Sequence, residues 1–104
     1  MCIRDSSNLG PALRDHGALV TQDPYPDQDF FRRSDNYSLA LKGIVAHTIS
    51  GWAVVPTYHT PEDTIANLDV PFMARAIQSL VAPLASLADS KARPEWKPGG
   101  RPTE

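Results

Sequence analysis

The order of apolar and polar residues along the chain predicts three helices and two strands. The helices are expected at 8–16, at 34–42 and from 69 onward, and the strands at 18–21 and 44–49. Gly17 and Gly43 stand where the first two helices should end. The second strand is rich in β-branched residues and contains no breaker. This order of elements is typical of an α/β fold with a parallel sheet.

The third helix carries a single apolar stripe, and Pro71 is tolerated in its first turn. The stripe consists of residues at three- and four-residue spacing: Val70, Met73, Ile77, Leu80, Leu84 and Leu87. We expect the whole stripe to face the core. Pro83 lies inside the helix and is expected to kink it or loosen one turn.

Two strands do not make a stable parallel sheet, because each would keep at least one open edge. The 104 residues allow one domain at most. The pattern therefore predicts the C-terminal part of a larger α/β domain, with an incomplete sheet.

The two ends of the chain are expected to differ from its middle. Residues 1–6 resemble the translation of an adapter used in sequencing libraries, so we expect them to be non-native, with the coding region cut at its 5′ side. Residues 7–92 form the domain portion, and the Pro- and Gly-rich residues 93–104 are expected to be loop or disordered.

Charge and hydropathy limit the partners. Ten Lys and Arg against twelve Asp and Glu give a net charge of -2, which offers no electrostatic case for binding nucleic acid. No run of about 18 apolar residues exists, so no membrane-spanning segment is expected.

The loop after the stronger strand carries the candidate chemistry. In open α/β sheets ligands bind at the carboxyl ends of the strands, where this loop should lie. His59 is followed by Glu62 and Asp63, so it is a candidate metal ligand with carboxylates nearby. The same run is also typical of a helix entry with acidic first-turn residues. Trp52, on the same loop, either packs or lines a side-chain pocket.

Four segments together resemble the C-terminal part of the bacterial M28-family zinc peptidases, which include aminopeptidases and glutamate-carboxypeptidase-like enzymes. The segments are Ser34-Asp35-Asn36-Tyr37, Gly43 to His47, Tyr58 to Thr64 and Arg93-Pro94-Glu95-Trp96. The resemblance implies a three-layer α/β/α zinc-exopeptidase fold and a pair of zinc ions. In such a site two metals polarise the scissile carbonyl and activate a bridging water.

The resemblance also assigns roles. His59 matches the last zinc ligand, and Tyr58 matches the donor that stabilises the oxyanion. Ser34 and Asp35 match a pair on the substrate side of the cleft, although a plain helix cap explains them equally well. Asn36 departs from relatives, which often have His or Tyr there.

Other parts of the family's site have no match. The first histidine, the bridging aspartate, the general-base glutamate and the remaining carboxylate lie upstream in the family, and nothing in residues 1–33 resembles them. Asp23, Asp27 and Asp29 read as solvated loop acids, His16 as a surface residue and His47 as a hydrogen-bonded interior residue.

Taken alone, the chain is therefore expected to be an inactive part of a peptidase whose substrates are peptides. The alternative is a non-catalytic receptor or scaffold relative of the same fold. The choice between aminopeptidase and carboxypeptidase stays open, and so does the oligomeric state. The resemblance alone suggests a periplasmic or secreted location.

Overall fold

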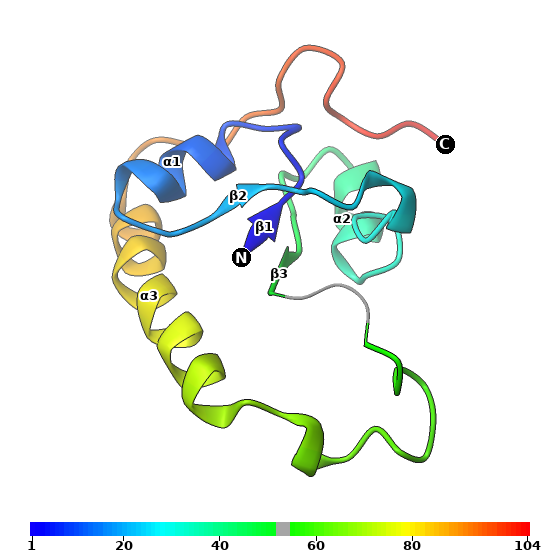
Figure 1. The fold of residues 1–104 in the computed structure, drawn as a ribbon. Helices are drawn as coiled ribbons and strands as arrows, with labels where there is room; N and C mark the ends of the chain where they lie inside the picture. The colour runs from blue at the N-terminus through cyan, green and yellow to red at the C-terminus, as the bar shows by residue number, and fades with distance from the viewer. Residues whose placement is uncertain (52–54) are drawn as a thin grey trace.

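The computed structural model describes residues 1–51 and 55–104 and has a small mixed α/β fold (Figure 1). Trp52 lies outside the described residues. The elements, in chain order, are β1 (Cys2–Ile3), α1 (Leu9–Asp15), β2 (Thr21–Gln22), the 3-10 turn η1 (Pro26–Gln28), α2 (Asn36–Leu41), β3 (Ile49–Ser50), the 3-10 turn η2 (Ile65–Asn67) and α3 (Val70–Asp89).

The three predicted helices are confirmed because local signals determine them. Gly17 and Gly43 follow α1 and α2 with φ of 93° and 91°, left-handed values that glycine adopts without a steric penalty. At the start of α3, the Asp69 carboxylate accepts a hydrogen bond from the Phe72 N–H at 2.9 Å. Pro83 lies inside α3, and the helix runs through it to Asp89.

The sheet differs from the predicted one. Its strand order is β2-β1-β3, with β1 parallel to β2 and antiparallel to β3. The predicted strands are therefore not neighbours, because β1 lies between them, and the sheet is mixed. Of the strand expected at 44–49, only its last residue is paired, in Ile49–Ser50. The preceding carbonyls of Gly43 and Ala46 accept bonds from side chains instead.

The core lies between the sheet and two helices. Ile3, Leu13, Ala18 and Val20 are buried together, and Leu80 and Leu87 of α3 pack against them. Figure 1 shows α1 beside the C-terminal half of α3. With seven residues, α1 spans about 10 Å, whereas the twenty residues of α3 span about 30 Å.

The predicted burial of the whole α3 stripe is therefore wrong. In its N-terminal half, Val70, Met73 and Ile77 remain 42–57% exposed, because α1 is too short to cover them. Leu84, in the C-terminal half, is 45% exposed as well. The part of the stripe that is partly buried, at Leu80 and Leu87, is the part next to α1 and the core.

The two chain ends meet in the structure. Residues 1–6 take part in the fold, with Cys2 and Ile3 buried in the central strand; their origin stays a prediction. The C-terminal segment (residues 93–104) has no helix and is held by hydrogen bonds. The Asn8 N–H donates to Glu95 O at 3.0 Å, and the Glu95 N–H donates to the Asn8 side-chain oxygen at 2.8 Å. The Lys97 N–H donates to Ser6 O at 3.0 Å.

By length and composition alone, α3 is apolar enough to cross a membrane, with a mean hydropathy of 1.3. This is weak evidence, because the core helix of a soluble protein passes the same test. The packing of Leu80 and Leu87 on the core is a second reason to read α3 as a helix of the fold. The expected absence of a membrane-spanning segment stays a prediction.

Candidate functional site

The loop that carries Tyr58 and His59 is built from consecutive tight turns. The Tyr58 N–H donates to Val55 O at 3.1 Å, and the Thr60 N–H donates to Thr57 O at 3.0 Å. The Thr60 hydroxyl donates to the same carbonyl at 2.8 Å. In Figure 1 this segment swings out from the rest of the fold before returning to α3. The turns give an exposed loop a defined backbone.

Tyr58 and His59 form a stacked pair on this loop. Their ring centroids lie 3.8 Å apart at an interplanar angle of 34°, and Tyr58 is 53% exposed. His59 has φ of 60°, in the left-handed region that residues with a Cβ enter at a cost of about 1–3 kcal/mol. Such strained residues cluster at functional sites, so the geometry marks this pair as a candidate site.

Glu62 follows His59 on the same loop and is exposed. Hydrogen bonding from Thr60 lowers the pKa of the Glu62 carboxyl. The Glu62 main-chain oxygen accepts a bond from the Asn67 amide at 2.6 Å, which ties the loop to η2.

A zinc pair needs more ligands than this loop supplies. In residues 1–51 and 55–104, no group of three or more His, Cys, Asp or Glu side chains is placed to hold a metal ion. A structural zinc has four ligands and a catalytic zinc has three plus a water. The described residues therefore do not fit a zinc pair by themselves.

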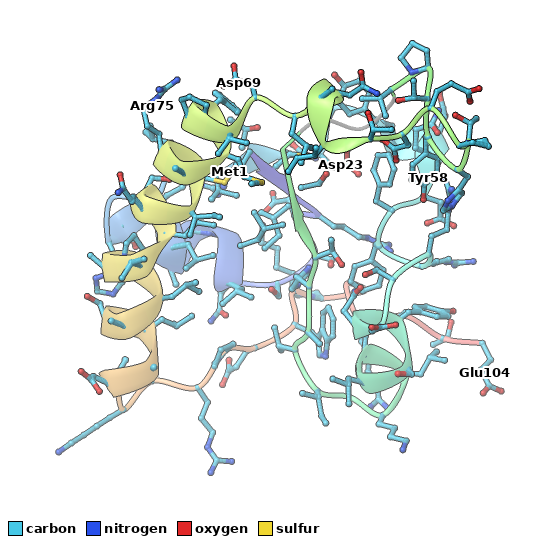
Figure 2. All side chains as sticks on the ribbon, turned by 90° about the horizontal axis from the view of Figure 1, so that it is seen from below. Met1, Asp23, Tyr58, Asp69, Arg75 and Glu104 are labelled. Carbon is cyan, nitrogen blue, oxygen red and sulfur yellow. The ribbon has the colours of Figure 1, made fainter. Side chains whose placement is uncertain are left out.

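Ser34 and Asp35 are exposed at the start of α2. Asp35 occupies the position before the helix, yet its side chain makes no capping hydrogen bond, so a plain helix cap does not explain this aspartate. Both views place α2 apart from the loop that carries Tyr58 (Figures 1 and 2). The structure therefore does not bring the two predicted halves of the site into contact.

Three of the four motif segments instead meet at an aromatic cluster of Phe31, Tyr37, His47 and Trp96. The rings of His47, Phe31 and Trp96 contact one another, with centroids 5.4 Å apart for His47 with each of the others and 6.3 Å apart for Phe31 and Trp96, and Phe31 packs edge-on to Tyr37 at 6.1 Å. The Trp96 indole N–H donates to Gly43 O at 3.0 Å. The predicted hydrogen bonding of His47 is confirmed, although the residue is half-buried, and the exposed His16 agrees with its surface prediction.

His47 is held in its neutral form. Its Nε2 bonds the Ser7 hydroxyl at 2.8 Å, while Nδ1 is buried without a hydrogen-bond partner among the described residues. Burial, helped by the positive charge of Arg4, lowers the pKa of His47 to about 4.

A cleft of about 570 Å³ opens elsewhere, among residues 4–6, 22–32 and 97–100. It contains none of the four predicted site residues. In the part of the chain that the structure describes, all four predicted site residues are exposed and none of them lines this cleft.

Sequence reasoning missed one buried polar residue, Asn36, whose side chain bonds three other residues. The only signal was its position between Asp35 and Tyr37 in a motif where relatives differ. Hydrogen-bond partners 10 and 12 residues away leave no local pattern in the sequence.

Comparison with known proteins identifies the class. A family model described as Peptidase family M28 matches residues 4–84, which is most of the 104-residue chain. The protein is thus related to peptidases, a class of hydrolases that act on peptides. The chain belongs to peptidase family M28. Neither a curated protein nor a solved structure matches it.

Proposed function

We propose that this chain is part of a zinc-dependent exopeptidase with a three-layer α/β/α fold. It contributes His59 as one metal ligand, Tyr58 as a hydrogen-bond donor, and Ser34 and Asp35 on the substrate side. The remaining ligands and the general base come from polypeptide beyond these 104 residues. Membership in family M28 supports the peptidase class and peptides as substrates.

The observation that carries this proposal is the Tyr58–His59 pair. Both rings stand on an exposed loop with a hydrogen-bonded backbone, and His59 has a left-handed φ of 60°. Imidazole is the commonest metal-binding side chain, and its exposure here leaves it accessible to a metal. The phenol of Tyr58 can donate a hydrogen bond to a carbonyl oxygen that gains negative charge, without bringing a charge of its own.

The exposed half of the α3 stripe supports the view that further polypeptide completes the fold. Three large apolar side chains in a row at three- and four-residue spacing, Val70, Met73 and Ile77, are normally covered by another layer in an α/β domain. Among the described residues, β2 and β3 are the edge strands of the sheet, and such edges are normally paired or covered in a complete domain.

The test is a substitution that removes the imidazole and keeps the backbone. Asn adopts the left-handed region readily, so His59→Asn should retain the loop conformation. In the enzyme produced from the complete reading frame, we expect H59N to lose about one zinc per molecule and to slow hydrolysis of an aminoacyl anilide at least 100-fold. The matched control is His16→Asn, which changes an exposed histidine at the end of α1.

Zinc content and rate that survive H59N would refute the ligand assignment. The 104-residue chain alone is expected to show no chelator-sensitive hydrolysis, because one histidine does not hold a zinc pair. Unchanged hydrolysis in the complete enzyme after removal of all zinc would favour a different mechanism. A complete protein without zinc or activity would favour the receptor or scaffold alternative.

A further inference from the structure

Asn36 is buried at the first residue of α2, with 9% of its surface exposed. Both the nitrogen and the oxygen of its side-chain amide form hydrogen bonds. The amide nitrogen donates to Phe31 O at 3.1 Å and to Ala46 O at 3.4 Å, and the amide oxygen accepts from the Thr48 hydroxyl at 2.7 Å. The position needs two donors and an acceptor in one short side chain, which only an amide supplies.

These bonds join two segments that no strand pairing connects. Ser34 and Asp35 lie between Phe31 and Asn36, so the turn that carries them is closed at both ends. Ala46 and Thr48 lie just before β3, on the stretch of chain that leads towards the loop of Tyr58. The Asn36 amide therefore cross-links the turn that carries Ser34 and Asp35 to residues 46–48.

We propose that Asn36 is a positioning residue. Its amide clamps the turn carrying Ser34 and Asp35 to residues 46–48, and so fixes the position of these two side chains on the fold. This inference rests on the proposed function, in which Ser34 and Asp35 line the substrate side. It gives the amide at position 36 a structural purpose although it does not touch the substrate.

The experiment separates geometry from stability by changing the partner of the amide. Thr48→Val removes the hydroxyl donor at nearly constant volume, and Thr48→Ser keeps it. In the complete peptidase we expect T48V to raise KM for an aminoacyl anilide about tenfold with kcat within about twofold, while T48S behaves like the wild type. Thr21→Val is the control, since its hydroxyl is exposed on β2.

A double-mutant cycle gives the second readout. Asn36→Ala and T48V remove the same hydrogen bond, so the double variant should have the KM of N36A alone. Additive losses, an unchanged KM in T48V, or a fall only in the amount of active enzyme would each reduce Asn36 to a residue that merely stabilises the fold.

Hydrogen exchange on the 104-residue chain separates failure of the clamp from failure of the proposed function. The Tyr37 amide, bonded to Ser34 O at 3.1 Å, should lose protection in T48V but not in T48S. If protection falls while the complete protein hydrolyses nothing, the clamp stands and the positioning role falls with the proposed function. Unchanged protection in T48V overturns the clamp itself.

Discussion

His47 shows how one side chain can report on its surroundings. Its ring contacts those of Phe31 and Trp96, and only one of its nitrogens has a hydrogen-bond partner among the described residues. The local sequence predicted an interior histidine, but its aromatic neighbours come from segments 16 and 49 residues away. Long-range packing of this kind fixes the protonation state and cannot be read from local periodicity.

The low pKa of His47 makes stability depend on pH. The unfolded chain binds a proton at this residue below about pH 6.5, whereas the folded chain binds it only near its pKa of about 4. The contribution of His47 to the unfolding free energy is therefore fully present above pH 6.5 and is lost as the pH falls towards 4. We expect about 1 kcal/mol to be lost from this ring between pH 7 and 4.5, after allowing for its partial exposure.

Urea unfolding at the two pH values measures this effect. His47→Gln keeps a polar group for Ser7 but does not titrate, so its unfolding free energy should change less with pH than that of the wild type. Carboxylates such as Asp5, whose pKa is lowered by hydrogen bonding to Lys97, titrate equally in both proteins and cancel in the comparison. Equal slopes for the two proteins would contradict the role given to His47.

At the level of elements, the helices were predictable and most of the strand pairing was not. Gly17, Gly43 and Asp69 act on their own neighbours, so their effect is visible in the sequence. Strand pairing depends on Cys2 and Ile3, which lie far from 44–49 in the chain. The sequence does not show that the carbonyls of Gly43 and Ala46 accept hydrogen bonds from side chains and not from a neighbouring strand.

The two aspartates that precede helices are expected to respond differently to removal. Asp69→Ala removes the bond to the Phe72 N–H and should cost about 1 kcal/mol of unfolding free energy. Asp35→Ala removes no capping bond and should cost less than about 0.5 kcal/mol. Chemical denaturation of both variants tests the contrast. A similar loss in both would restore the interpretation of Asp35 as a plain helix cap.

Over the whole molecule, the candidate site was predictable only as a set of residues. The sequence placed Tyr58 and His59 on a loop, and the structure gives that loop its turns and the strained φ of His59. Both views show this loop apart from α2 (Figures 1 and 2). The separation could not be predicted from the sequence, because it depends on the path of the long segment between β3 and α3. The assigned roles stay predictions.

The C-terminal segment should contribute measurably to stability. A chain ending at Ala92 loses the bonds to Asn8, Ser6 and Gly43, and we expect a loss of about 2 kcal/mol once the regained chain entropy is counted. A chain without only Thr103 and Glu104, both exposed, is the control. Equal urea midpoints for the two shortened chains would show that the segment adds nothing.

The pairing of Asn8 with Glu95 also has a kinetic consequence. These residues are 87 positions apart, so a native contact next to α1 closes a loop of nearly the whole chain. Loops of this length form slowly and raise the contact order. During synthesis, this contact forms only after residue 95 has left the ribosome. Until then Phe31 and His47 lack their ring contacts with Trp96, so the aromatic cluster is completed late.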